Sequence, residues 1–431
     1  METISYPARE TWASIVRRPF EDNADVSAAV GEIIEEVRRG GDGAVMAYEA
    51  RFDKATLRTL VVSDEEKALA AAEVPGELKA AIDLAHKNIQ SFHAAQRFVG
   101  QEVATSPGVT CWQKSIPIES VGLYVPGGTA PLFSTVLMLA TPAVIAGCKN
   151  IIMCTPPGSD GRVNPAILYA AVTAGVTNIF KAGGAQAIAA MAYGTESIHK
   201  VNKIFGPGNR YVTAAKQHVA AHGVAIDLPA GPSEVCVIAD GNADTPFVAA
   251  DLLSQAEHGV DSQVLLITDT PRQAERVEEE VTRQLSALPR KDIAAKSLAN
   301  SRIVIVHDTD EAMELSNAYA PEHLIIQTDD CARLAEKVTN AGSVFIGRYA
   351  CESAGDYASG TNHTLPTHGY ATCYNGVNLD SFCRKTTFQR ITPEGIRCIG
   401  KAVEVMASAE RLEGHKNAMT LRIEACKKGT R

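Results

Sequence analysis

Apolar and polar residues alternate along the first third of the chain with the period of amphipathic helices. The pattern predicts helices at residues 25–39, 43–51, 65–72 and 77–92, a short strand at 60–62, and extended runs at 109–117 and 120–125. Gly40 and Gly41 separate the first two helices, because glycine tolerates backbone conformations that end a helix. The most apolar run, residues 132–146, contains hydroxyl side chains and a proline, so it predicts a buried helix and not a membrane span.

From residue 151 onward, strands and helices alternate in the rhythm of parallel sheets. Strand-like segments at 151–154, 177–180, 203–205 and 225–228 are bridged by helical stretches. A second series has strands at 235–239, 264–268, 302–306, 324–327 and 343–346, with helices between Asp244 and Gly259 and at 271–285, 310–319 and 333–340. The sequence therefore predicts an α/β protein with two sheets.

The last part of the chain breaks this alternation. Residues 347–385 are rich in Gly, Ser, Thr and Asn and predict an irregular segment, whereas the chain from Pro393 onward is predicted to be helical. On that helix, one apolar stripe is formed by Ile396, Ile399, Val403 and Met406. The stripe needs a surface that covers it.

Composition narrows the class of protein. At 431 residues, with 45% hydrophobic and 21% charged residues, the chain is long enough for two or more globular domains. A net charge of -9 provides no basic field for a nucleic acid, so a small-molecule partner is expected. The first residues lack the apolar core of a signal peptide, and the ten cysteines form no C-x-x-C pair. Both features predict a cytoplasmic location without membrane attachment.

Glycine marks three of the predicted strand-to-helix turns: Gly127-Gly128, Gly183-Gly184 and Gly206-Pro207-Gly208-Asn209. In a parallel sheet these turns lie at the carboxyl ends of the strands, where glycine lets a ligand approach the backbone. The sequence has no G-x-G-x-x-G motif, so a dehydrogenase with the common dinucleotide fingerprint is not indicated. A dinucleotide that binds here is expected to bind in another way.

Gln255 and His258 are three residues apart near the C-terminal end of a predicted helix, so their side chains are expected on one face. A carboxamide oxygen and an imidazole nitrogen suit a borderline cation such as zinc, which then needs two further ligands. The alternative for these two residues alone is a polar helix end capped by its own side chains.

Other candidate residues lie in turns and loops. Glu322 and His323 stand between a predicted helix and a predicted strand and form a candidate acid/base pair, the alternative being two solvated loop residues. In the irregular segment, Asp356 offers an oxygen ligand, and His363 offers either a ligand or a substrate contact. Each of these last two, taken singly, is also typical of an ordinary turn.

Two further pairs are weaker candidates. Glu410 and His415 lie at the end of the C-terminal helix, where a histidine is normally solvated. Cys148 and Cys154 flank a predicted strand, and a reactive thiol there would suit aldehyde oxidation through a thiohemiacetal. The alternative, small buried apolar side chains, is more typical of cysteine.

Most of these candidates lie in the segments VGLYVPGGTAPLFSTVLMLATPA, GGAQAIAAMAYGTES, KIFGPGN, IDLPAGPSEV, DLLSQAEHG, APEHLI, SAGDYASGTNHTLPT and AERLEGHKNAMTLR. With these segments the chain resembles the histidinol dehydrogenase family over nearly its whole length; residues 1–20 and about 375–397 are less typical. Members of that family are homodimeric, zinc-dependent enzymes. They oxidise L-histidinol to L-histidine in two NAD-linked steps, the last of histidine biosynthesis.

The resemblance implies a role for each matching residue. The ligands of one Zn²⁺ per subunit would be Gln255, His258, Asp356 and His415, and the proton acceptors would be Glu322 and His323. Histidinol would contact Ser233, Gln255, His258, His323, Asp356, Glu410 and His415. NAD would contact Tyr124, Gln186 and Asn209, and the last two belong to the glycine turns.

The resemblance also implies two Rossmann-like parallel-sheet domains, one inserted in the other. The first domain, with the metal site, would comprise residues 21–123 and 232–378, and the inserted domain, with the NAD contacts, residues 124–231. Small terminal segments, an N-terminal arm (1–20) and a C-terminal helical tail (379–431), would contact the other subunit of a homodimer. His415 would then complete the active site of the other subunit.

In the mechanism that follows, His323 deprotonates the alcohol while hydride passes to NAD. Glu322 then activates the water that hydrates the aldehyde before the second oxidation. Within the superfamily, the alternative is a zinc- and NAD-linked dehydrogenase for another small amino or polar alcohol. Outside it, the alternatives are a zinc hydrolase, in which Glu322 activates a metal-bound water, and a non-catalytic metal-binding protein.

Overall fold

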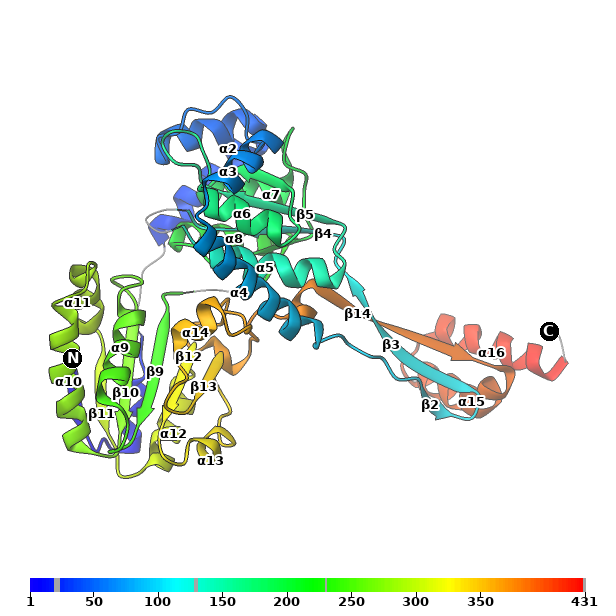
Figure 1. Ribbon diagram of the computed structural model, residues 1–431. Helices are drawn as coiled ribbons and strands as arrows, with labels where there is room; N and C mark the ends of the chain where they lie inside the picture. The colour runs from blue at the N-terminus through cyan, green and yellow to red at the C-terminus, as the bar shows by residue number, and fades with distance from the viewer. Residues whose placement is uncertain (19–23, 128–130, 229–230, 429–431) are drawn as a thin grey trace. The chain divides into compact units, whose positions relative to one another are not determined.

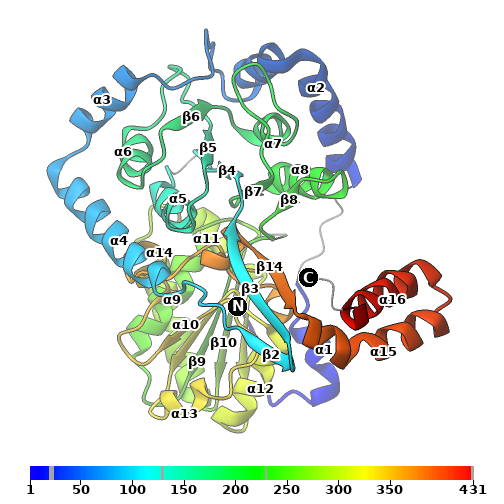
Figure 2. The same ribbon diagram turned by 90° about the vertical axis from the view of Figure 1, so that its right-hand side faces the viewer.

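The computed structural model describes residues 1–18, 24–127, 131–228 and 231–428. The chain divides into two compact units. The first comprises Met1–Ala95 and Ile118–Phe382 and holds two parallel sheets with their helices, and the second comprises Gln96–Pro117 and Cys383–Arg431. The predicted α/β class with two parallel sheets is confirmed (Figures 1 and 2). The second unit holds a small antiparallel sheet, which the sequence pattern did not predict.

One parallel sheet has five strands in the order β6-β5-β4-β7-β8. Its strands are β4 (Ser120–Tyr124), β5 (Asn150–Thr155), β6 (Asn178–Lys181), β7 (Lys203–Phe205) and β8 (Ala225–Ile226). One face is covered by α3 (Asp64–Glu73), α4 (Gly76–Ala94), α5 (Phe133–Ala146) and α6 (Pro165–Thr173), and the other by α2 (Ala24–Phe52), α7 (Gly184–Tyr193) and α8 (Arg210–Ala221). Because successive side chains of a strand point to opposite faces, Leu123 and Tyr124 enter different cores.

The predicted elements of this sheet are mostly present, with two differences. Residues 60–62 form only a single bridge, between Val61 and Phe180, and not a strand. Helices α2 to α4 were predicted to belong with residues 232–378, but their apolar faces pack on this sheet, and β4 is its central strand. The predicted helix break at Gly41 is confirmed, since α2 has a non-helical backbone there (φ 53).

The other parallel sheet has six strands in the order β1-β11-β10-β9-β12-β13. Its strands are β1 (Glu2–Ser5), β9 (Glu234–Ala239), β10 (Gln263–Thr268), β11 (Arg302–Ile305), β12 (His323–Gln327) and β13 (Ser343–Ile346). One face carries α9 (Thr245–Ala256), α10 (Pro271–Leu285) and α11 (Lys291–Ala299), and the other α1 (Trp12–Ile15), α12 (Thr309–Tyr319) and α13 (Cys331–Ala335) (Figure 1). Helix α14 (Glu352–Tyr357) packs beside α9.

The sequence pattern did not predict several short elements of this sheet and its helices. The N-terminal arm supplies β1, which pairs in parallel with β11 as an edge strand. Helices α11 and α14 were not predicted, and α13 ends at Ala335 instead of residue 340. Short helices draw most of their stability from packing and not from their own sequence, so a local pattern predicts them poorly.

The second unit contains the strands β2 (Val103–Ser106), β3 (Val109–Pro117) and β14 (Cys383–Ile391), in the order β14-β3-β2. The tail (379–431) was predicted to be helical from Pro393, which α15 (Pro393–Ala409) and α16 (Glu413–Lys428) confirm, but β14 precedes these helices and was not predicted. The charged and hydroxyl residues of β14 give this strand no apolar face of its own, so the strand forms through its pairing with β3. In this pair, Phe388 of β14 stacks on Trp112 of β3 (5.6 Å between ring centroids). On α15, Ile396 is buried while Met406 is 64% exposed.

Candidate active site and metal centre

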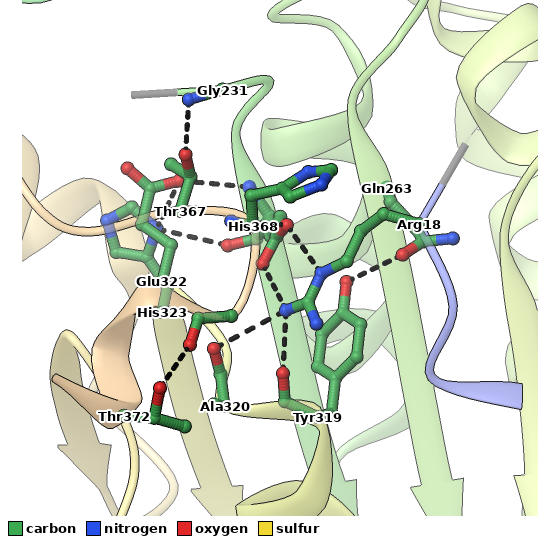
Figure 3. Close-up of polar contacts among 12 residues, drawn as sticks. Arg18, Gly231, Gln263, Tyr319, Ala320, Glu322, His323, Thr367, His368 and Thr372 are labelled. Atoms are coloured by element: carbon green, nitrogen blue, oxygen red, sulfur yellow. Dashed lines mark hydrogen bonds and ion pairs between the residues drawn. The ribbon is translucent and has the colours of Figure 1, made fainter. Parts of the chain in front are cut away.

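Glu322 and His323 lie at the amino end of β12, next to the amino end of β9 (Figure 3). Both side chains are buried. Glu322 Oε2 accepts a hydrogen bond from the main-chain N–H of Glu234 (2.9 Å), and His323 Nδ1 lies 3.3 Å from the main-chain oxygen of Glu234. The chain enters this turn through Ala320, whose left-handed backbone (φ 50) is costly for a residue with a Cβ atom. The turn therefore directs two ionisable side chains inward.

Carboxyl groups surround the imidazole of His323. Glu322 Oε2 lies 3.6 Å from Nδ1, and Asp356 Oδ1 lies 3.4 Å from Nε2. Burial works against a charged imidazole, but the negative charges of Glu352, Glu322 and Asp356 outweigh it and raise the pKa of His323 to about 10. Burial raises the pKa of Glu322 to about 8. The site thus concentrates negative charge that a bound cation would offset.

A cluster that fits a metal ion lies next to this pair. His258, Glu352 and Asp356 each offer one ligand atom, and these atoms lie within 4.8 Å of one another. The amide group of the fully buried Gln255 lies against Glu352, and the amide orientation that satisfies both groups is the one in which the Gln255 nitrogen donates to Glu352 Oε2 (3.1 Å). Asp356 Oδ1 is buried and has no hydrogen-bond partner among the described residues. Nitrogen and oxygen donors with an unsatisfied carboxylate oxygen suit a divalent cation such as Zn²⁺.

Helix α9 brings Gln255 and His258 to this cluster in a way that differs slightly from the prediction. The helix ends at Ala256, so His258 lies in the turn beyond it. There the main-chain N–H of His258 donates to the main-chain oxygen of Gln255 (3.2 Å). The helix was predicted to continue to Gly259. Both side chains nevertheless lie beside Glu352.

Glu352 is the residue of this cluster that sequence reasoning missed. It is 1% exposed, and burial raises its pKa to about 8. Glu352 and Asp356 are four residues apart on α14, so their side chains share one helix face. That spacing could have revealed the residue, had the segment not been predicted to be irregular.

The side chain of His363 contacts the main chain of Asp356 near the cluster. Its Nδ1 lies 3.0 Å from the main-chain oxygen of Asp356, and its Nε2 lies 3.0 Å from Thr135 Oγ1 of α5. Since both ring nitrogens have protein partners, His363 holds the segment that carries Asp356.

The remaining predicted substrate residues occupy two places. Ser233 directly precedes β9, and its main-chain oxygen accepts from the N–H of Gln263 (3.1 Å). Glu410 caps the end of α15, and His415 lies in the first turn of α16; both are exposed and belong to the second unit. Their assignment to the site stays a prediction.

The glycine turns lie at the carboxyl edge of the five-stranded sheet, as predicted, except that Gly128 lies outside the described residues. The N–H of Gly184 donates to the hydroxyl of Tyr124 (3.1 Å), and Gln186 lies on the first turn of α7. Asn209 caps α8 by accepting from the N–H groups of Tyr211 and Val212. The three predicted NAD contacts therefore belong to elements of one sheet edge.

Glu49 of α2 supports this edge and was not predicted. Its Oε1 accepts from the N–H of Gly183 (2.9 Å) and from Gln186 Nε2 (2.8 Å). Burial, together with the neighbouring Asp53, raises the pKa of Glu49. A glutamate on the buried face of α2, next to Val45 and Tyr48, is the signal that could have identified it.

The cysteine hypothesis is not supported by the environment of the two thiols. Cys148 and Cys154 are both buried, and burial raises the pKa of the Cys154 thiol well above its usual range. A raised pKa disfavours the thiolate, which is the nucleophilic form.

Comparisons with known proteins place the chain among its relatives. The sequence model of the family described as histidinol dehydrogenase matches residues 16–423. Histidinol dehydrogenase of Bacteroides thetaiotaomicron is 61% identical over 427 residues, which cover 99% of this chain and 100% of the relative. That of Escherichia coli is 51% identical over 415 residues, covering 96% and 95%. The crystal structure of histidinol dehydrogenase from Elizabethkingia anophelis has a TM-score of 0.97 and 51% identity, with 99% of each chain covered. In the part of the chain that the structure describes, no helix is long and apolar enough to cross a membrane.

Proposed function

We infer the reaction from the family: the chain belongs to the histidinol dehydrogenases, because the family model spans residues 16–423 and a full-length relative is 61% identical. The protein is an oxidoreductase that converts histidinol to histidine, the final step of histidine biosynthesis. The observation that carries this conclusion at the site is the buried pair of Glu322 and His323 next to the His258, Glu352 and Asp356 cluster. Acid/base groups beside a metal-binding cluster suit the oxidation of an alcohol.

Our proposal for the cofactors is one Zn²⁺ per subunit and NAD. Gln255, His258 and Asp356 hold the metal, with His415 supplied by the second subunit of a homodimer. Glu352 orients the Gln255 amide by accepting its N–H. When bound, Zn²⁺ supplies positive charge that anchors substrate donors and offsets the carboxylates around His323. Tyr124, Gln186 and Asn209 contact NAD at the sheet edge that Glu49 supports.

In the first oxidation, the neutral imidazole of His323, whose raised pKa a bound cation would lower, accepts the hydroxyl proton of histidinol through Nε2. Its Nδ1 faces the main-chain oxygen of Glu234, an acceptor, so Nδ1 carries a hydrogen and Nε2 is the nitrogen that exchanges a proton. Hydride passes from the carbinol carbon to the nicotinamide. The products are histidinaldehyde, NADH and one proton held at His323.

In the second oxidation, water adds to the aldehyde carbon and Glu322 accepts the proton that the water loses. Burial raises the pKa of the Glu322 carboxyl group to about 8, against the opposing effect of the hydrogen bond from the Glu234 N–H. A pKa near the pH of the working solution suits a general base. The hydrated aldehyde transfers its hydride to a second NAD, and histidine is the product. Two NAD are reduced for each histidinol.

The test is to incubate the purified protein with L-histidinol and NAD and to measure NADH and histidine together. We expect two NADH for each histidine. A ratio of one, with the aldehyde as product, would refute the two-step assignment. A panel of small amino alcohols tests the alternative of a related dehydrogenase, and hydrolysis of an amide or ester without NADH would indicate the zinc hydrolase instead.

A further inference from the structure

Arg18 and Glu234 form a buried ion pair beside the candidate active site. Arg18 donates through Nε and Nη2 to the two carboxylate oxygens of Glu234 (2.8 and 2.7 Å), and the two side chains are 11% and 3% exposed. This parallel double hydrogen bond is the strongest geometry an arginine offers to a carboxylate. Neither residue belongs to the set that carries the proposed chemistry.

The pair joins segments that are far apart in the sequence. The guanidinium of Arg18 lies over the ring of Tyr319 (4.0 Å to the centroid) and donates to the main-chain oxygen of Tyr319 (2.6 Å) (Figure 3). The carboxylate of Glu234 also accepts from the main-chain N–H of His368 (2.9 Å). The N-terminal arm, the start of β9, the end of α12 and the loop at 367–368 therefore meet at one ion pair.

The main chain of Glu234 contacts both members of the acid/base pair. Its N–H donates to Glu322 Oε2 (2.9 Å), and its carbonyl oxygen lies 3.3 Å from His323 Nδ1. The first contact engages Oε2 of Glu322 in a hydrogen bond and so fixes the orientation of the carboxylate. The second contact favours a hydrogen on Nδ1 of His323. The position of one peptide unit thus determines the orientation of two side chains.

We propose that Arg18 and Glu234 are positioning residues, whose ion pair holds the β9 main chain in the place from which it orients Glu322 and His323. The inference rests on the proposed function, because it gives these two side chains the proton transfers. Mutation cannot remove the main-chain carbonyl group of Glu234. The test therefore mutates the ion pair that holds this carbonyl group in place. Partners that orient a reacting group from outside change activity by about 10-fold to 100-fold when removed.

A purely structural role predicts a different result. Replacing a buried ion pair by apolar side chains is often neutral for stability, whereas removing one partner leaves a buried charge unpaired. If the pair only stabilised the fold, its loss would lower the melting temperature and the amount of active enzyme, and the surviving enzyme would keep its kcat for each active site. A positioning role predicts a lower kcat in enzyme that is fully folded.

The variants are Arg18→Met, Glu234→Gln and the double variant, with Arg18→Lys as the conservative replacement. In zinc-loaded enzyme we expect kcat with histidinol to fall by about 10-fold or more in each single variant, with the KM for NAD within about two-fold. The double variant should be no worse than the poorer single one, since the two residues act as a unit. Arg18→Lys retains the charge and should recover part of the rate.

Glu73→Gln is the matched control, because Glu73 pairs with Arg162 through an exposed contact (2.6 Å) on another part of the first unit. It should leave kcat and both KM values unchanged. If Arg18→Met does not fold, Glu234→Gln and Arg18→Lys carry the test. Folded variants with unchanged kcat, or with equal loss of kcat and of NAD affinity, would overturn the positioning role.

Failure of the proposed function is recognised separately. If the parent protein reduces no NAD with histidinol, the proposed function is wrong. The orientation of His323 is then tested without turnover, by ¹⁵N NMR of protein labelled at histidine. The His323 signals are assigned by comparison with His323→Asn. In zinc-loaded protein, where the charge of the metal offsets the surrounding carboxylates and the imidazole is neutral, we expect a hydrogen-bearing Nδ1 in the parent and a mixture of tautomers in the variants. Identical spectra would refute the anchoring of the imidazole by the ion pair.

Discussion

Asp251 provides a test of how burial acts on the charges near the candidate metal cluster. It lies on α9 and is 6% exposed, and its Oδ2 accepts a hydrogen bond from Gln327 Nε2 (3.0 Å). Burial raises the pKa of this carboxyl group from 3.8 to about 7, against the smaller opposing effect of the Gln327 bond. Asp251→Asn keeps the shape and an acceptor oxygen for Gln327 but cannot ionise, so it isolates the cost of the charge.

The sign follows from linkage. A carboxyl group with a raised pKa in the folded state contributes stability that is fully present below its unfolded pKa and is lost as the pH rises through its folded pKa. The full shift of about three units corresponds to about 4 kcal/mol, and the part between about pH 5 and pH 8 to about 3 kcal/mol. Asp251→Asn should therefore gain stability relative to the parent as the pH rises, by an amount equivalent to roughly 3 °C in melting temperature.

The assay is thermal and urea unfolding of both proteins at about pH 5 and pH 8, with a chelator present so that no bound cation changes the local charge. We expect the difference in unfolding free energy between variant and parent to increase between the two pH values. Asp292→Asn, at an exposed position in the first turn of α11, is the control and should show no such increase. A difference that stays constant with pH would show that folding does not raise the pKa of Asp251, so that the carboxyl group is already ionised at pH 5 in both states, and the reasoning from burial would fail.

Four further predictions concern the site. Glu322→Gln should slow oxidation of histidinaldehyde by about 100-fold while leaving NAD affinity unchanged in a binding titration, since the amide cannot accept the proton of water; an unchanged aldehyde rate would exclude Glu322 as the base. Chelation should abolish NADH formation and zinc should restore it, and His258→Ala should bind zinc at least about 10-fold more weakly by calorimetry, so full affinity in that variant would move the metal elsewhere. Refolding His258→Ala and His415→Ala together by random reassortment should restore about a quarter of normal activity if the sites are shared, because about half of the dimers are then mixed and one of the two sites in each mixed dimer carries no lesion; no recovery with mixed dimers present would place His415 in its own subunit's site. Cys148→Ser should leave both oxidation steps intact, and selective loss of the aldehyde step would revive the thiohemiacetal route.

Local pattern was a good guide to elements that carry their own signal. The period of apolar residues predicted helices such as α4, a continuous apolar run predicted α5, and the break at Gly41 followed from glycine alone. Gln255 and His258 were recognised from a three-residue spacing, and Glu322 and His323 from adjacency in a turn. In each case the physical cause lies within about one helical turn of the residue itself, so the sequence displays it.

The residues that local pattern missed depend on distant partners. Glu352 became a candidate only when α14 put it on one helix face with Asp356 and packed that helix beside α9. Strand β14 formed because β3 pairs with it along its full length, and Glu49 gained its role from the turn at Gly183. The partners in α9, in β3 and at Gly183 lie far away in the sequence, so spacing along the chain does not identify them.

The sequence by itself determined the α/β class, the alternation of strands and helices, and, through its resemblance to a family, the reaction. Only the tertiary structure decided which groups share an environment, and Arg18 and Glu234 illustrate the difference. They are 216 positions apart, yet their ion pair lies against the main chain that holds the candidate acid/base pair. Hydrogen bonds and charge interactions depend on distance in space, and burial that shifts a pKa arises from packing of the whole unit. The properties of this site therefore arise on folding.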